Sequence, residues 1–237
     1  MNISQARRFL GMCDRILVIT GAGISSESGI PTFRGAGERW RDRHVSELAT
    51  PAAFEEDPRL IWDWYSYRRE IVARSEPNAA HIALANWAKG RTGVTLVTQN
   101  VDGLHERAGH PEVAHIHGSL WHNRCTECDK EREDLALLYP ELPRSPCCGA
   151  LERPAIVWFG ERLPAKTREQ ALAAAMDAEA IVTIGTSGKV ATAASLVRIG
   201  KLRHAEIFDV NPEHSCIEAN SRFAGLAGEI IPQLLAA

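Results

Sequence analysis

The chain has 237 residues, enough for one large domain or for a domain with a small insertion. Hydrophobic residues make up 45% of it, which supports a sizeable core and excludes a largely disordered chain. The formal net charge of −3 argues against a surface that binds nucleic acid or anionic membranes. No apolar run approaches the roughly 18 residues of a membrane span. We therefore expect a monomer with neither a nucleic acid nor a membrane as partner.

Residues 1–14 predict an amphipathic first helix rather than a targeting segment. Arg7 and Arg8 are present, but no extended apolar stretch or small-residue cleavage site follows them. This pattern indicates a cytoplasmic protein.

Residues 16–20 form an apolar, β-branched run that predicts a buried parallel strand over 15–20. The loop after it, 21–35, nearly matches a dinucleotide-binding turn, because Gly21 and Gly23 allow a tight turn and close approach of the backbone to a pyrophosphate. Ser26 stands where the third glycine of that fingerprint is expected. Pro31 follows where a dehydrogenase would continue a crossover helix. The loop therefore predicts a dinucleotide that is held in an unusual way.

A second predicted strand, 94–98, leads into a loop that carries Gln99, Asn100 and Asp102. In an open α/β sheet, ligands bind in the loops at the carboxyl ends of the strands. These side chains can hydrogen-bond an amide, a ribose or a water. The alternative is an Asx turn that caps a helix beginning at Leu104.

His115 and His117 follow in a segment that we expect to be extended, so that both rings lie on one face. His117 precedes Gly118 and lies beside the proposed dinucleotide loop, so it is a candidate general base near neutral pH. The alternative is a structural histidine.

Four of the six cysteines lie within residues 125–148, which in a reducing compartment favours a metal site over disulfides. Cys125 and Cys128 form a C-x-x-C knuckle, and Cys147 and Cys148 follow about twenty residues later, as in a structural zinc site. Ser145 occupies the position where a second C-x-x-C would begin. The alternative is therefore a degenerate ribbon without metal.

Further strands at 180–184 and 206–210, and helices at 79–89, 165–178 and 190–200, complete an alternating pattern. This pattern predicts an α/β fold, a Rossmann-like and mostly parallel sheet with helices on both faces. Two segments interrupt it and should together form a small lobe: a helical insert, 37–74, and a zinc-ribbon-like insert, 121–155. The Rossmann-like domain would then comprise 1–36, 75–120 and 156–237.

Seven motifs, in this order, resemble the sirtuins, which are NAD-dependent protein lysine deacylases: GAGISSESGIPTFRG, TQNVDG, HIHGS, the C-x-x-C knuckle, IVWFGE, GTS and VNPE. The similarity runs over roughly residues 10–235. It implies NAD as co-substrate and acylated-lysine proteins or peptides as partners. It also implies that zinc, if bound, is structural and distant from NAD.

The resemblance implies roles for the matching residues. His117 and Asn100 would be catalytic, with His117 as the base that acts on the ribose hydroxyls after the acyl oxygen has displaced nicotinamide from the ribose. Nicotinamide, O-acyl-ADP-ribose and free lysine would be the products. The positions that would bind NAD are Gly21, Ala22, Gly23, Ser25, Phe33, Arg34, Trp40, Gln99, Asn100, Val101, Asp102, Gly185, Thr186, Ser187, Asn211, Pro212, Glu213 and Ala227.

The resemblance also implies where the acylated peptide binds. Its backbone would add as a strand between 157–161 and 188–190, in contact with Val157, Trp158 and Phe159. Tyr65 and Arg68 match a pair found in class III sirtuins, and they share a face if 58–74 is helical. A phenol and a guanidinium can bind a terminal carboxylate, and Ala36 matches the small residue that widens this pocket. Succinyl- and malonyl-lysine are therefore expected substrates alongside acetyl-lysine.

Three other functions compete with deacylation. An ADP-ribosyltransferase would use the same cofactor chemistry. A dehydrogenase is disfavoured by Ser26 and by the polar surroundings of Asp42, which has the spacing of a ribose-binding acid. A zinc-ribbon binding module is disfavoured by the acidic balance of charge.

Overall fold

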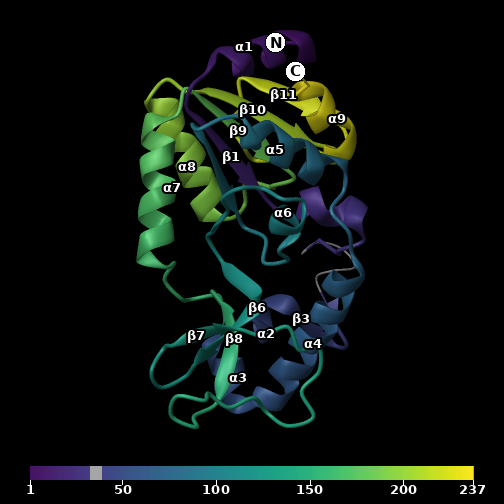
Figure 1. Cartoon of the computed structure of the whole chain (residues 1–237), viewed down its shortest axis with the longest axis vertical. Coiled ribbons are helices and arrows are strands. Elements are labelled where there is room, and N and C mark those ends of the chain that lie inside the picture. The colour runs from purple at the N-terminus through teal and green to yellow at the C-terminus, as the bar shows by residue number, and fades with distance from the viewer. Residues whose placement is uncertain (33–38, 237) are drawn as a thin grey trace.

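The computed structural model describes residues 1–32 and 39–236. Its larger part is a parallel sheet of six strands in the order β11-β10-β9-β1-β4-β5. Figure 1 shows β1, β9, β10 and β11 of this sheet in the upper half of the molecule. The strands are β1 (Ile16–Thr20), β4 (Val94–Thr98), β5 (Ala114–His115), β9 (Ala180–Ile184), β10 (Glu206–Asn211) and β11 (Ser221–Ala224). Every residue of β1 and β9 is buried, as expected for strands covered on both faces.

Helices cover both faces of this sheet, and the alternation of side chains along β1 divides the core in two. Ile16 and Val18 pack on the side of α1 (Ile3–Met12), α5 (Ala79–Lys89) and α9 (Ala227–Leu234). Leu17 and Ile19 pack on the side of α7 (Ala165–Asp177) and α8 (Ala191–Leu202). The predicted strands and helices of this layer are confirmed to within two residues at each end.

The order of the strands reverses at β1. The chain runs from β1 to β4 on one side and later fills β9 and β10 on the other side. A crevice forms at the carboxyl ends of the strands where such a reversal occurs. The loops after β1, β4, β9 and β10 therefore meet, and the short helices η1 (Ala22–Ser28) and α6 (Leu104–Arg107) begin there.

The two segments that interrupt the pattern pack together as a second lobe, in the lower half of Figure 1. One supplies the hairpin of β2 (Arg39–Trp40) and β3 (Arg43–His44), and the helices α2 (Val45–Leu48), α3 (Pro51–Glu56) and α4 (Pro58–Arg74). The other contributes most of an antiparallel sheet of β6 (Gly118–Cys125), β7 (Glu131–Glu133) and β8 (Glu152–Ile156). The predicted fold class, with a small lobe beside a Rossmann-like sheet, is confirmed.

The antiparallel sheet escaped the sequence patterns because polar side chains occupy part of its interior. Asn123 and Glu152 are buried, and the Asn123 amide donates to the Glu152 carboxylate at 3.1 Å. The buried guanidinium of Arg69 donates to the side-chain oxygen Oδ1 of Asn123 at 2.9 Å and to the hydroxyl of Tyr139. Buried polar groups that satisfy one another replace the alternation of apolar residues on which strand prediction depends.

No helix in the described part of the chain is long and apolar enough to cross a membrane.

Three histidines lie together under the carboxyl end of β1. The ring centroids of His81 and His105 are 4.9 Å apart, and those of His105 and His110 are 6.3 Å apart. His105 Nε2 lies 3.0 Å from the hydroxyl of Thr20. Burial lowers the pKa of all three rings, and that of His81 to about 4. The core therefore holds these rings in their neutral forms at neutral pH.

We expect this cluster to make the protein acid-labile. Above pH 6.5 His81 is neutral in the folded and unfolded chains and contributes no pH dependence. Between pH 6.5 and about 4 only the unfolded chain takes up the proton, so stability falls with falling pH, by up to about 3 kcal/mol for this group. Urea unfolding of wild type and His81→Gln across this range should show a shallower pH slope for the variant.

The matched control is His214→Gln, since His214 is exposed. It should keep the wild-type slope. An unchanged slope in His81→Gln would contradict the assignment.

Candidate active site

A cavity lies where the carboxyl ends of the strands face the small lobe. Predicted site residues from the loops after β1 and β4 line it: Ala22, Ser25, Asn100, Val101 and Asp102. From the small lobe, Trp40 and Arg68 close it. The structure thus brings together residues that lie as much as 80 positions apart in the sequence.

One face of α4 forms a wall of this cavity that the sequence reasoning recognised only in part. Trp64, Tyr67, Arg68 and Ile71 all line it. Their spacing of i, i+3, i+4 and i+7 is that of a single helical face. This periodicity was the signal that could have identified Trp64, Tyr67 and Ile71 together with Arg68.

A hydrogen-bonded network fixes the polar side chains of the cavity. Asn100 Nδ2 donates to the Gly21 carbonyl at 3.2 Å and to Ser25 Oγ at 3.1 Å, and Ser25 Oγ donates to Asp102 Oδ2 at 2.8 Å. The other carboxylate oxygen of Asp102 accepts the Leu104 amide at 3.0 Å, so this residue does cap α6. Burial raises the pKa of Asp102, and the hydrogen bonds from Leu104 and Ser25 act against that rise.

His117 is held as a neutral base. Its Nδ1 lies 3.1 Å from the carbonyl of Gln99, which can only accept, so Nδ1 carries the hydrogen and Nε2 carries the lone pair. Burial lowers the pKa of the ring, although the Gln99 carbonyl acts in the opposite direction. At neutral pH the ring can therefore accept a proton at Nε2.

His115, two residues before His117, is unsuited to act as a general base. Its Nδ1 lies 3.3 Å from the Asn100 carbonyl, and its Nε2 pairs with the carboxylate of Glu106. Burial disfavours the charged ring, but Glu106 more than offsets this and raises the pKa of His115. Both nitrogens of His115 face acceptors, which favours its charged form over the neutral form that a general base requires.

The glycines of the first loop are required for contact between two loops. A Cβ added to Gly21 would lie 2.9 Å from the carbonyl oxygen of Gly185. A Cβ added to Gly23 would lie 2.7 Å from the Cα of Gly185. Gly185 itself has a φ of +60°, in the left-handed region. The smallness that we attributed to pyrophosphate binding is therefore needed first for packing of the β1 loop against the β9 loop.

The remaining predicted dinucleotide residues extend along the same edge of the sheet. Gln99 Nε2 donates to Thr186 Oγ1 at 2.9 Å, and Asn211 Nδ2 donates to the Thr186 carbonyl at 3.2 Å. The other members differ in exposure: Pro212 and Glu213 are exposed, Ser187 is half-buried, and Ala227 is buried at the start of α9. Phe33, Arg34 and Ala36 lie outside the described residues.

The predicted acyl-binding pair is divided between the cavity and the core. Arg68 is half-buried and lines the cavity. Tyr65 is fully buried behind it, and its hydroxyl accepts the indole N–H of Trp158 at 2.8 Å. The two residues share a side of α4, since the Arg68 guanidinium carbon lies 5.5 Å from the Tyr65 ring centroid.

In one segment predicted to pair with a peptide, 157–161, the side chain of Phe159 is 61% exposed. In the other, 188–190, the side chain of Val190 is 43% exposed. The amides of 157–161 are largely engaged within the chain. Those of Val157 and Phe159 donate to the carbonyls of His117 and Ala49. An added strand would have to use the remaining backbone groups of this segment.

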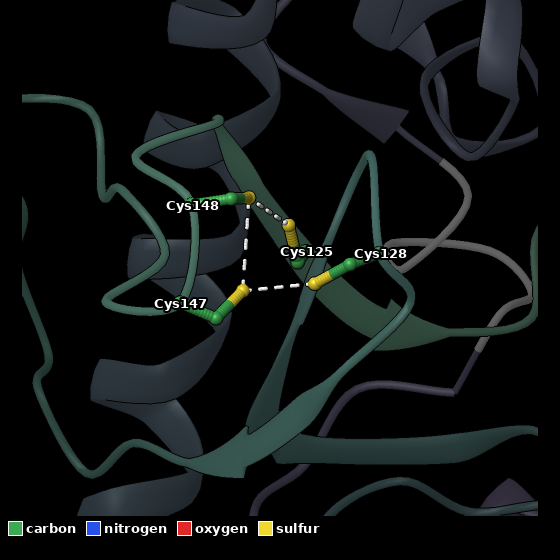
Figure 2. Close-up of side chains that lie close together, drawn as sticks. All are labelled: Cys125, Cys128, Cys147 and Cys148. Carbon is green, nitrogen blue, oxygen red and sulfur yellow. Dashed lines mark hydrogen bonds between the residues drawn. The ribbon is translucent and has the colours of Figure 1, made fainter.

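The four clustered cysteines converge on one point, as Figure 2 shows. Their sulfur atoms all lie within 4.8 Å of one another, with Cys128 and Cys147 2.8 Å apart and Cys125 and Cys148 3.4 Å apart. Sulfur ligands around a tetrahedral zinc lie roughly 3.8 Å apart, for Zn–S bonds of about 2.3 Å. The donor set therefore fits a zinc ion held by Cys125, Cys128, Cys147 and Cys148.

The doubt raised by Ser145 is wrong. A turn in which the Gly149 amide donates to the Ser145 carbonyl at 2.9 Å places both neighbouring cysteines toward the knuckle. Cys147 thereby supplies the fourth thiol from a position two residues later than the regular spacing. The hydroxyl of Ser145 remains beside the cluster, 3.0 Å from the sulfur of Cys147.

Comparisons with known proteins agree with this geometry. Residues 21–192 match a model described as the Sir2 family. The NAD-dependent protein deacylase of Pyrococcus furiosus is 42% identical over 98% of this chain and 96% of the relative, and that of Aquifex aeolicus is 44% identical over 85% of both. A Sir2 homologue in complex with NAD superimposes with a TM-score of 0.93, at 41% identity over 98% of this chain and 92% of that one. A Sir2–p53 peptide–NAD+ complex superimposes with a TM-score of 0.86, at 27% identity over 99% of this chain and 98% of that one.

We expect about one zinc ion per chain, bound by all four thiols. Cys147→Ser and Cys148→Ser should each lose most of the bound zinc and lower the melting temperature, because the four thiols hold the β6–β7 turn to the 145–149 turn. Metal analysis and thermal unfolding measure the two effects. Cys216→Ser, at an exposed cysteine outside the cluster, is the control. Full zinc content in Cys147→Ser would exclude that residue as a ligand.

Proposed function

Because this chain belongs to the Sir2 family of NAD-dependent protein deacylases, as its motifs indicated, we propose that it removes acyl groups from protein lysines while consuming NAD. The products would be nicotinamide, O-acyl-ADP-ribose and free lysine. The observation that carries this proposal is the fixed network of Asn100, Ser25 and Asp102 in the cavity, next to a neutral His117.

The residues of the site fit NAD by their chemistry. The side-chain oxygen of Asn100 and the carboxylate of Asp102 can accept hydrogen bonds from the NH2 group of a nicotinamide carboxamide. Backbone groups of the packed loops at Gly21–Ser25 and Gly185–Ser187 are suited to the phosphates, with Asn211 and Ala227 near the adenosine. When bound, NAD supplies a ribose carbon that becomes electrophilic as nicotinamide departs.

His117 would act on the ribose. Its Nε2 accepts a proton from a ribose hydroxyl, while the Gln99 carbonyl keeps the hydrogen on Nδ1 and orients the ring. Burial lowers the pKa of the ring, which favours its neutral form near pH 7. Removal of the imidazole would leave binding intact but delete the base.

His117→Ala is expected to lower kcat for acyl removal by about 10²- to 10⁴-fold, the usual contribution of a general base. Release of free lysine from an acetyl-lysine peptide with NAD measures this, and circular dichroism checks the fold. His204→Asn, at an exposed turn after α8, should retain wild-type activity. Wild-type activity in His117→Ala would refute the role, and label from NAD retained on protein would favour ADP-ribosyl transfer.

The acyl group would be read by Arg68. Burial lowers the pKa of this guanidinium, while Tyr65 and Asp102 act against that fall, and an arginine remains a cation in proteins. It is a positive charge on the wall of the cavity, and a terminal carboxylate would pair with it through charge-assisted hydrogen bonds. We therefore propose succinyl- and malonyl-lysine as substrates alongside acetyl-lysine.

Arg68→Met should lower kcat/KM on a succinyl-lysine peptide by about 10- to 100-fold, because a charged hydrogen-bonding group is lost. The value for the acetyl-lysine version of the same peptide should stay within a few-fold, since an acetyl group has no carboxylate. Arg74→Met, at the exposed end of the same helix, is the matched control. Equal losses on both peptides would contradict carboxylate recognition.

A further inference from the structure

Trp158 makes a buried contact that its proposed place beside the peptide does not explain. Its side chain is 2% exposed, and its indole N–H donates to the hydroxyl of the fully buried Tyr65 at 2.8 Å. The two residues are 93 positions apart in the chain, one after β8 and the other on α4. This hydrogen bond joins the peptide-binding segment to the helix that forms the wall of the cavity.

The indole is itself firmly held. The guanidinium carbon of Arg153 lies 3.4 Å from the indole ring centroid. Arg153 binds the Glu161 carboxylate through two hydrogen bonds of 2.6 and 2.8 Å, and Glu161 in turn accepts the backbone amide of Trp158 at 2.8 Å. The position of the indole N–H is therefore fixed by an ion pair that clamps the ring.

The guanidinium of Arg68 packs against the same phenol: its carbon lies 5.5 Å from the ring centroid of Tyr65. The indole N–H is a donor only, so it gives its hydrogen to the phenol oxygen. Burial raises the pKa of Tyr65, so the phenol is neutral at neutral pH. The phenol thus connects a fixed indole to a guanidinium that lines the cavity.

We propose that Trp158 is a positioning residue for carboxylated acyl groups: its indole N–H fixes the phenol of Tyr65, and the phenol fixes the guanidinium of Arg68 at the cavity wall. A carboxylate is then met by a guanidinium in a set orientation. An acetyl group makes no such contact. This inference rests on the proposed function and adds the residue that sets its acyl preference.

Trp158→Phe removes the indole N–H and keeps an aromatic ring against Arg153. We expect KM for a succinyl-lysine peptide to rise roughly 5- to 10-fold relative to KM for the acetyl-lysine version of the same peptide, the effect of one buried hydrogen bond. Any change in contact with the peptide backbone affects both peptides equally and cancels in this ratio. An equal loss on both peptides would show a merely structural role and overturn the proposal.

Trp62→Phe is the matched control. Trp62 is 1% exposed and donates its indole N–H to the Glu152 carbonyl at 2.9 Å, so the same kind of bond is lost in the same lobe. Its effect on stability should resemble that of Trp158→Phe, without any change in the succinyl-to-acetyl ratio. A change in that ratio as large as in Trp158→Phe would overturn the proposal.

A double-mutant cycle tests whether Trp158 acts through Tyr65. In a Tyr65→Phe background, Trp158→Phe should cause no further loss on the succinyl peptide, because the acceptor oxygen is already absent. Fully multiplicative losses would overturn the proposal. If Trp158→Phe does not fold, Arg153→Lys loosens the clamp and should give a smaller loss with the same succinyl selectivity, and no selective loss would overturn it.

The outcomes for wild type separate this inference from the proposed function. Failure to deacylate either peptide would refute the proposed function. Activity on both peptides with an unchanged succinyl KM in Trp158→Phe would refute only the role of Trp158. Activity on acetyl-lysine alone would overturn the positioning role while leaving deacylation in place.

Discussion

The loops after β1 and β9 pack backbone against backbone at the centre of the sheet, and the geometry of the site depends on this contact. Gly21 and Gly23 face Gly185 with no space for a Cβ on either of the two. The contact draws Ser25 and the Gly21 carbonyl to where Asn100 and Asp102 can bind them. A side chain at either glycine would separate the two loops and break the hydrogen bonds of the network. Close packing of these loops is therefore required both for the fold at the centre of the sheet and for the geometry of the cavity.

Several buried polar groups in this protein are oriented by partners that can only donate or can only accept a hydrogen bond. A backbone carbonyl sets the tautomer of His117, and an indole N–H sets the direction of the phenol of Tyr65. Each such partner removes an alternative arrangement that a lone polar side chain would have. Side chains of the site are thereby oriented before any ligand arrives, which lowers the cost of ordering them on binding.

The small lobe depends on similar means for its stability. Its apolar cluster includes Trp62, Trp64 and Tyr65, but its sheet encloses Asn123 and Glu152. Arg69 and the four cysteines join segments that the apolar core alone does not connect. Both groups of contacts lie away from the cavity, so they affect the site through the position of α4 and β6.

The sequence by itself determined the strands and helices of the parallel layer, the fold class and the family. Runs such as 16–20 and 180–184 are bounded by turn residues and are buried on both faces, so local composition defines them. The loops after the first two predicted strands meet in space, because the carboxyl ends of parallel strands lie at one edge of the sheet.

The tertiary structure alone decided which groups share a hydrogen bond. It distinguished the neutral His117 from the charged His115, because Glu106 contacts only the latter. It also showed that Cys147 compensates for Ser145, and that Tyr65 faces Trp158 rather than the cavity. Local patterns specify helices, strands and turns, whereas these contacts join residues that only packing brings together.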